Sequence, residues 1–549
     1  MRTINHYIYS AFAVLLLGYG LVSCDNYLDV SPTDQVSDNN AWSTTGVADM
    51  FLNDIYGSLP GSFTTNDPDE SFSDNTMRGS SSGYSFTAYA KSSYTPGSVR
   101  DDWTTNFAKI RKCNVFIEKV SASALPDAWK VTRIAETRFL RAYFYQLLWT
   151  RYGGVPIITE VLNREKQGDE IFRERSTSDE TFKFITDECA AIAADLPLTP
   201  DKGRASKGAA LTLKGWCELF QASPLKNPTN DKARWATAAA TNKQVMDLNK
   251  YSLFPDLETL FYEENNNNVE VIFDKAYLGG TTLGASREGL HGAWMVGGTQ
   301  RAWSAPNPTQ EIVDSYFMAN GLPITDPASG YDPQNPYLNR EKRFYQSVIY
   351  DGSKWLGFEM EMWIGSGSRN MLDLSSANEA TNTGYYLRKG LNPKYEFASG
   401  DQRLSSASFI IFRFAEVLLS YAEAKNEEVG PDASVYSAVN KVRERSGLPA
   451  LKSGLTQAQM RVTIQQERRV ELAFEEKRWP DLLRLKIAET TLNGAFHAMK
   501  IVKEAGKKVY SVIEAPNGGR IFFANRNYLL PIPQAVLDKN AKLKQNPNY

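Results

Sequence analysis

The sequence predicts a mainly α-helical protein with a loop-rich middle portion. Apolar residues recur at helical spacing over about 101–250 and again over about 407–486, as they do on the buried faces of helices. From about 251 to 405 the spacing changes, and Gly, Asn, Ser and aromatic residues form long stretches with few short strands. At 549 residues the chain can bury a sizeable core and form two or more domains.

The N-terminal segment ends in "LLLGYGLVSCDNYLD", residues 15–29. Arg2 precedes an apolar stretch over about 7–22 that is shorter than a bilayer-spanning helix, so residues 1–23 read as a secretory signal. The four residues that end in Cys24 resemble a bacterial lipobox, which predicts that Cys24 is acylated and becomes the mature N-terminus. The alternatives are an ordinary signal with a coincidental cysteine and, less favoured, a transmembrane anchor.

Charge and residue counts exclude several classes of function. The formal net charge of −2, with no basic block, gives no case for nucleic acid as a partner. Three histidines, one of them in the leader, make a histidine-based metal site improbable, and we expect no metal or cofactor. Cys113, Cys189 and Cys217 lie in helical patterns without a CxxC pair, so we expect buried thiols.

The first helices follow one another with clear ends. Asp101 or Asp102 is a natural N-cap for an apolar stripe that runs to Val120. The next helix, over about 135–152, ends at Gly153, Gly154 and Pro156. Thr177 and Glu180 then have the spacing of a capping box, and Pro197 ends the helix that they start.

Two further helices, over about 206–223 and 233–251, carry small residues where helices must approach closely. Tetratricopeptide-like helix pairs use small and aromatic residues in this way, although the repeats here are degenerate. In the middle portion we expect short strands in 268–277 and 343–352. Helices are expected again at 407–427, 433–447 and 456–486.

Six segments in order resemble the SusD/RagB family of outer-membrane lipoproteins, which capture nutrients for a SusC-like TonB-dependent transporter. They are "SCDNYLD", "RFLRAYFYQLLWTRYGGVPIIT", "FRFAEVLLSYAEAKNE", "VNKVRERSGLP", "ERRVELAFEEKRWPDLLRL" and "YLLPIPQ" with "NAKLKQNPNY". The resemblance implies four tetratricopeptide-like helix pairs that support a loop-rich ligand-binding portion with a few short strands. We accordingly expect an N-terminal SusD-like region over 24–250 and a C-terminal SusD/RagB region over 251–549.

The same resemblance implies a non-catalytic lipoprotein exposed on the cell surface. Such a protein binds an oligosaccharide, or sometimes another nutrient, and acts as the lid of its transporter partner. The open alternatives are a surface glycoside hydrolase, a binder of a peptide or protein-derived nutrient, and an interaction protein whose helices bind a macromolecular partner.

One run of carboxylates could suggest a hydrolase. Glu467, Glu471 and Glu475 share a helix face, and two carboxylates can act as acid and base on a glycosidic bond. The interleaved arginines favour a structural ion network instead, because paired acids stay ionised. The pattern "GSSSG" at 79–83 matches a nucleophile elbow, but the polar residues before it favour a surface loop. For the acids at 67–74 we expect a solvated loop and no calcium site.

Ligand contacts are expected from loops that combine aromatic rings with planar polar groups, because sugars have apolar C–H faces and many hydroxyls. Two loops qualify, and in starch-binding members of the family the contacts come from similar positions. The first has no tryptophan. The candidates are Asp74, Asn75, Arg78 and Tyr84 in the first loop, with Tyr89 and Tyr94 nearby, and Trp294, Arg301 and Trp303 in the second, with Trp355 and Trp363 as further aromatic residues.

Overall fold

The structure is a computed structural model that describes residues 42–61, 69–78, 84–293, 302–304, 306–365, 367–368, 370, 372–374, 380–395 and 402–549. Its α-helices are α2 (Thr45–Gly57), α3 (Tyr84–Ala90), α4 (Asp102–Ala122), α5 (Asp127–Tyr152), α6 (Arg164–Gln167), α7 (Ser178–Ile192), α8 (Lys207–Ala222), α9 (Lys232–Asp247), α10 (Arg287–His291), α11 (Gln310–Ser315), α12 (Lys342–Ser347), α13 (Phe414–Val429), α14 (Ala433–Arg445), α15 (Gln457–Glu471), α16 (Arg478–Arg484), α17 (Ala488–Thr491) and α18 (Gln534–Leu537). Its strands are β1 (Thr76–Met77), β2 (Val271–Lys275), β3 (Asn307–Pro308), β4 (Val348–Ile349), β5 (Lys354–Trp355), β6 (Phe358–Glu359), β7 (Tyr386–Leu387), β8 (Phe409–Arg413), β9 (Gly494–Glu504) and β10 (Lys507–Arg520).

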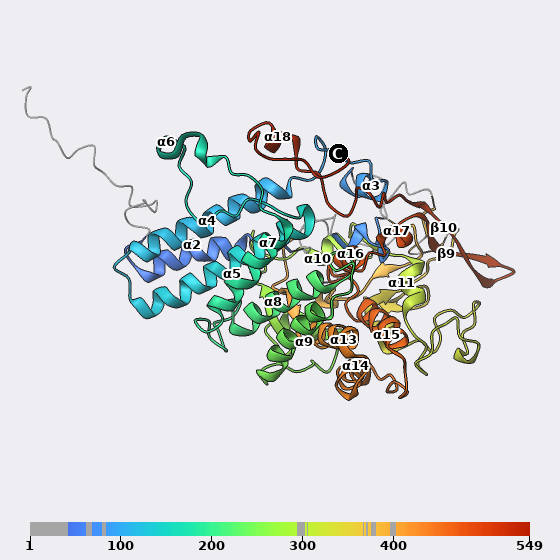
Figure 1. The fold of residues 1–549 in the computed structure, drawn as a ribbon. Coiled ribbons are helices and arrows are strands. Elements are labelled where there is room, and N and C mark those ends of the chain that lie inside the picture. Colours follow the sequence, from blue (N-terminus) through green and yellow to red (C-terminus); the bar gives the residue numbers. More distant parts are fainter. Residues whose placement is uncertain are drawn as a thin grey trace, which may run out of the picture.

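The long helices form a continuous layer in which each packs on the next. α4 packs on α5, α5 on α7, α7 on α8, α8 on α9, α9 on α13, and α13 on α14 and α15. Taken two at a time, these eight helices make four pairs, as expected. α9 and α13 are neighbours in space although the whole loop-rich portion separates them in sequence (Figure 1). That portion is therefore inserted between two helices of one pair.

Local sequence signals explain the helix ends and the close packing. Asp101 caps α4, since its side chain accepts a hydrogen bond from the Thr104 N–H (2.8 Å). The predicted capping box of Thr177 and Glu180 is confirmed at the start of α7. Gly208 of α8 lies so close to α9's end that a Cβ there would meet the Tyr251 hydroxyl at 2.1 Å. The absence of a side chain at Gly208 therefore makes room for Tyr251.

In two segments the observed secondary structure differs from the expected one. The strand expected in 268–277 is confirmed as β2, which pairs antiparallel with β8. Because β8 takes residues 409–413, the helix expected over 407–427 begins only at Phe414. The strand expected over 343–352 is wrong in its first part, which forms α12 before the two-residue strand β4. Pairing partners far away in sequence decide these boundaries.

A long hairpin, β9–β10, projects from the body near the red end of the chain in Figure 1, and sequence analysis missed it. Its two-residue turn consists of Ala505 (φ 47°) and Gly506 (φ 80°). Positive φ at both positions fits the turns that match the twist of paired strands. Gly506 and the β-branched residues around it were the available signals.

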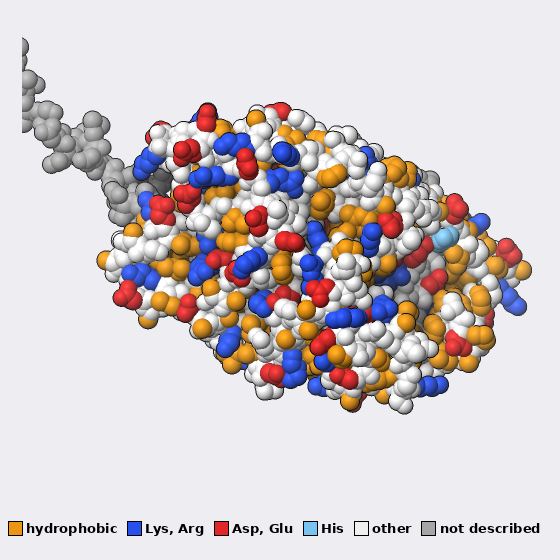
Figure 2. All heavy atoms as spheres, in the orientation of Figure 1, with side chains coloured by type: hydrophobic (Ala, Val, Ile, Leu, Met, Phe, Trp, Pro, Cys, Tyr) orange, Lys and Arg blue, Asp and Glu red, His pale blue; other side chains and the backbone are white. Residues whose placement is uncertain are grey.

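Burial and surface charge fit the expectations from composition. Cys113, Cys189 and Cys217 are all buried with free thiols, as predicted, and burial raises the pKa of Cys113 to about 12. Lys and Arg side chains are interspersed with Asp and Glu over the face shown in Figure 2. Among the described residues, every helix is too short or too polar to cross a bilayer.

Candidate functional site

Strands β1 and β3 bring the two predicted ligand loops together. Thr76 is paired with Pro308 and Met77 with Asn307 in antiparallel register. In an antiparallel pair, the chain that leaves one strand and the chain that enters the other lie at the same end. The residues after Met77 and the residues before Asn307 therefore share one end of this ladder, which we call the loop end.

A third segment joins the loop end, and sequence analysis did not select it. The side-chain amide of Asn382 donates a hydrogen bond to the Arg78 carbonyl (3.1 Å). Thr381 holds this segment in a tight turn, because its hydroxyl oxygen accepts hydrogen bonds from the N–H groups of Thr383 and Gly384, both at 3.1 Å. The run "TNTG" at 381–384 was a turn signal that could have identified it.

Trp303 is the described aromatic candidate that remains open to solvent. Its side chain is 47% exposed, whereas its backbone N–H donates to the Gly289 carbonyl of α10 (2.9 Å). The next residue, Ser304, is buried, and its hydroxyl lies 3.0 Å from Asn307 Oδ1. A fixed backbone thus carries an exposed indole ring, an arrangement suited to stacking on a sugar.

Asp74 and Asn75 require a correction. Asp74 is 2% exposed and pairs with Arg478 and Arg469, both at 2.7 Å. Burial alone raises the pKa of Asp74, but these two arginines outweigh it and hold the pKa well below its usual range. Asn75 is buried between Glu70 Oε1, to which its amide donates, and Arg469, which donates to its Oδ1. Both residues support the loop from beneath and are poor candidates for ligand contact.

The acids around Asp74 also differ from the expected solvated loop. Glu70 is buried and its Oε1 accepts from the Phe474 N–H (2.9 Å), while Asp69 pairs with Arg100 (2.7 Å) and with Arg151. No group of three or more potential metal ligands occurs among the described residues. Glu70 thus links this segment to the residues that follow α15, and Asp69 links it to α5 and to the residues before α4.

The other predicted contacts are placed as follows. Arg78 is half-buried at the end of β1, and α3 begins at Tyr84. Trp294, Arg301 and Cys24 lie outside the described residues, as does the whole of "GSSSG".

Most of the additional aromatic residues are packed inside the protein. Tyr89 stacks on Phe72 with ring centres 4.1 Å apart, and Tyr94 and Trp355 are buried. Trp363 is half-buried under Lys503, whose Nζ lies 3.9 Å from its ring centre. Packing explains these rings without any ligand.

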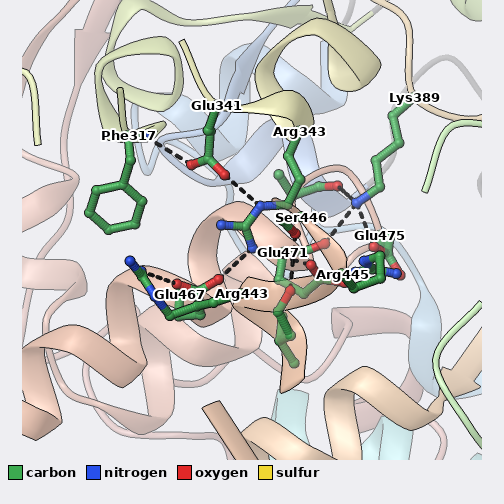
Figure 3. Close-up of polar contacts among 12 residues, drawn as sticks. Phe317, Glu341, Arg343, Lys389, Arg443, Arg445, Ser446, Glu467, Glu471 and Glu475 are labelled. Atoms are coloured by element: carbon green, nitrogen blue, oxygen red, sulfur yellow. Dashed lines mark hydrogen bonds and ion pairs between the residues drawn. The ribbon is translucent and has the colours of Figure 1, made fainter. Parts of the chain in front are cut away.

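The helix expected over 456–486 ends at Glu471, so Glu467 and Glu471 lie on α15, whereas Glu475 lies in the turn before α16 and does not share their helix face. All three carboxylates belong to a buried ion network, shown in Figure 3. Arg343 donates to Glu467 (2.6 Å), and Arg413 donates to Glu471 (2.6 Å) and to Glu475 (2.7 Å). We use "buried ion network" for the set Glu270, Glu341, Arg343, Lys389, Arg413, Arg443, Arg445, Glu467, Glu471 and Glu475.

The network confirms the structural interpretation of this run. Burial by itself raises the pKa of Glu471, but Arg445, Arg413 and Arg343 outweigh it and hold the pKa well below its usual range. A general acid for glycoside cleavage needs a raised pKa and access to the substrate, and Glu471 has neither.

The partners of these acids are not the arginines that interleave with them in sequence. Arg468 and Arg484 both pair with Asp481 (2.7 Å each), whereas Arg469 and Arg478 pair with Asp74. Neighbours one residue apart on a helix point in different directions, so the acids of α15 take their cations from other elements.

Comparison with models of known families shows to which family the chain belongs. Residues 269–549, just over half of the chain, match the model of the SusD family. The chain belongs to the SusD family. Residues 26–214 match a second family model, described as "Starch-binding associating with outer membrane".

Similar proteins agree with this membership along almost the whole chain. A "SusD-like protein P2" of Formosa agariphila is 26% identical over 82% of this chain and 81% of its own length. A SusD-like protein from Bacteroides fragilis superposes with a TM-score of 0.78 at 27% identity, covering 94% of this chain and 100% of that one. A "SusD-like carbohydrate binding protein" from the same species has a TM-score of 0.76 at 27% identity, over 92% and 99%. The predicted SusD-like fold is therefore confirmed.

Proposed function

We propose that this SusD-family protein binds an oligosaccharide on the cell surface and passes it, chemically unchanged, to a SusC-like TonB-dependent transporter. The loop end is the proposed binding surface. Trp303 would stack on a sugar ring, while Arg78, Tyr84, Trp294 and Arg301 stay candidates for further contacts.

The observation that carries this proposal is the meeting of the two loops at the β1–β3 ladder with Trp303 exposed beside them. An exposed aromatic ring beside polar loop groups is suited to sugars, because C–H faces stack on the ring and hydroxyls bond to the polar groups. A similar structure is named a carbohydrate-binding protein, and the N-terminal family description also refers to starch binding. Both support a glycan over a peptide as ligand.

Lipid attachment at Cys24 is the proposed link to the outer membrane. The lipobox-like sequence before Cys24 and the family description that mentions the outer membrane support it. We expect Cys24→Ala to leave the membrane fraction and to lose acylation, which mass spectrometry of the N-terminal peptide measures. Acylated Cys24→Ala protein in the membrane fraction would contradict the anchor.

Calorimetry across a panel of oligosaccharides and peptides tests the binding surface. We expect an oligosaccharide to bind the wild type and Trp303→Ala to weaken it by about tenfold or more, since stacking contributes about 1 kcal/mol beyond buried area. Trp129→Ala, at the start of α5 in the helix layer, is the matched control and should bind normally. Binding of peptides alone, or equal affinity in Trp303→Ala, would contradict the proposal.

The hydrolase alternative loses its best carboxylates, because Glu467, Glu471 and Glu475 are buried and paired. Prolonged incubation with the bound oligosaccharide, followed by chromatography of the products, tests catalysis directly. We expect the oligosaccharide to be recovered intact. Shorter products that persist after repurification and disappear in a Glu471→Gln variant would overturn a purely binding role.

A further inference from the structure

A cavity of about 460 Å³ lies between helices α4, α5 and α8, strand β8 and the start of α16. Its volume is within the range of small-molecule sites. Among the described residues that line it, none is Arg78, Trp303 or Asn382, so it is separate from the loop end. Five of its lining residues are proposed below to contact a ligand: Lys109, Tyr143, Gln146, Trp216 and Lys275.

Two cations in this cavity lack a carboxylate partner within the described part of the chain. Lys109 places its Nζ 5.3 Å from the centre of the Phe144 ring, and Lys275 donates from Nζ to the Leu59 carbonyl (2.6 Å). Both side chains are half-buried. Ammonium groups that are withdrawn from water are normally paired with an anion, so these two favour a negatively charged ligand.

The carboxylates that line the same cavity are already neutralised. Asp69 and Asp102 share Arg100 and Arg151, with distances from 2.5 to 3.3 Å. Glu475 belongs to the buried ion network.

Glu476, which follows it, accepts a hydrogen bond from the Glu70 N–H (3.0 Å). Burial, followed by the charges of Asp69 and Glu70, raises the pKa of Glu476 well above its usual range, which favours its neutral form. These carboxylates therefore leave Lys109 and Lys275 unbalanced.

The cavity also has neutral polar and aromatic groups, which could contact a part of the ligand other than its negative charge. Tyr143 and Gln146 are 6% and 7% exposed, yet neither the Tyr143 hydroxyl nor the Gln146 side-chain amide has a hydrogen-bond partner among the described residues. Neither group is fully enclosed, so both can reach the space of the cavity. Trp216 adds an apolar ring, stacked on Phe220 with centres 5.6 Å apart. A sugar ring needs such polar and aromatic surfaces together.

We propose that this cavity binds a small acidic sugar of hexuronate size, with its carboxylate at Lys109 and Lys275 and its ring against Tyr143, Gln146 and Trp216. This site is independent of oligosaccharide binding at the loop end. An acidic monosaccharide would occupy the interior of the helix layer while a longer glycan occupied the loops.

Calorimetry with D-glucuronate tests the proposal, with D-glucose as its neutral analogue and acetate as the anion alone. We expect glucuronate to bind at least about tenfold more tightly than either. Glucose lacks the carboxylate, whose hydrogen bonds contribute more than neutral ones, and acetate lacks the ring that contacts Tyr143, Gln146 and Trp216. Lys109→Met should weaken glucuronate binding by about tenfold or more, and Tyr143→Phe should weaken it by less. Lys112→Met, which removes a charge from the exposed face of α4, is the control and should bind normally.

The pH dependence separates a direct role of Lys109 from a structural one. Lys109 is faced by Arg151 from α5, Lys275 from β2 and Asp102 from its own helix; burial, then Arg151 and Lys275, lower its pKa to about 8. Glucuronate affinity should therefore decrease as pH rises through about 8 in the wild type and stay level in Lys109→Met.

Three results would overturn the assignment: equal binding of glucose or acetate, unchanged affinity in a folded Lys109→Met protein, and no glucuronate binding. Trp303→Ala should leave glucuronate affinity unchanged, so failure of this site and failure of the loop-end site are distinguishable.

Discussion

The buried ion network and the loop end are both rich in the residue types that ligand sites use, but they differ in exposure and pairing. Glu471 is fully buried, and Arg343, Arg413 and Arg445 balance its charge, so it is not available to a ligand. Trp303 at the loop end is 47% exposed on a fixed backbone. From sequence alone, both regions are candidate functional sites. The structure distinguishes them, because only the loop end exposes its side chain to a ligand.

The largest effect should come from breaking the buried ion network. Arg413 pairs with Glu270, Glu471 and Glu475, and its removal leaves buried carboxylates without their cation. We expect Arg413→Met to lower the free energy of unfolding by about 3–5 kcal/mol, measured by urea denaturation.

An exposed ion pair provides the control for this measurement. Arg173 pairs with Glu160 on the surface, where both side chains are well exposed. Arg173→Met should change stability by less than about 1 kcal/mol, because solvent screens such pairs. Equal effects of the two substitutions would show that burial does not distinguish them.

Asp74 was predicted as a ligand contact in the first loop, but it is buried and paired with arginines, as the acids of the buried ion network are. Asp74→Ala leaves Arg469 and Arg478, whose side chains are only 14% and 11% exposed, without their carboxylate, so we expect a loss of about 3 kcal/mol in unfolding free energy. Oligosaccharide affinity per folded molecule should stay the same. An affinity loss with normal stability would restore Asp74 as a ligand contact.

Glu288 of α10 should give a pH dependence opposite in sign to that of the network acids. Burial raises its pKa to about 7, so the folded state holds its proton more tightly than the unfolded state does. Its contribution to stability is thus full below the ordinary carboxyl pKa and is lost as pH rises through about 7. For Glu471, whose pKa is lowered, stability is lost as pH falls in the acid range.

Urea denaturation between pH 5 and 8 measures this difference. Replacing Glu288 by Gln, which keeps the shape without the titrating group, should reduce the decline in stability over that range. If the stability of the Glu288→Gln variant declined as steeply as that of the wild type, groups other than Glu288 would cause the decline.

Trp303 should give the smallest change in stability. Because its ring is exposed, Trp303→Ala should alter the free energy of unfolding by no more than about 0.5 kcal/mol, although we expect it to weaken oligosaccharide binding. Thermal denaturation beside the binding measurement checks both. A large loss of stability would place the ring in the core and remove the distinction between the two regions.

The degree to which the sequence predicted the site depended on how far apart the contacting residues are. The cap at Asp101 and the capping box of Thr177 were predictable because donor and acceptor lie within one turn. The role of Asp74 was not, because Arg478 lies 404 residues further along the chain. Asn382 was missed for the same reason, since it joins Arg78 from 304 residues away.

The sequence by itself determined the helix periods, their caps, the lipobox-like leader and the ordered motifs of the SusD family. These are local patterns, and local backbone and side-chain preferences suffice to produce them. The tertiary structure alone decided which acids are buried and paired, which loops meet at the β1–β3 ladder, and where a cavity forms between α4, α5, α8 and β8. Burial and pairing depend on contacts between segments distant in sequence, and those contacts form only when the chain folds.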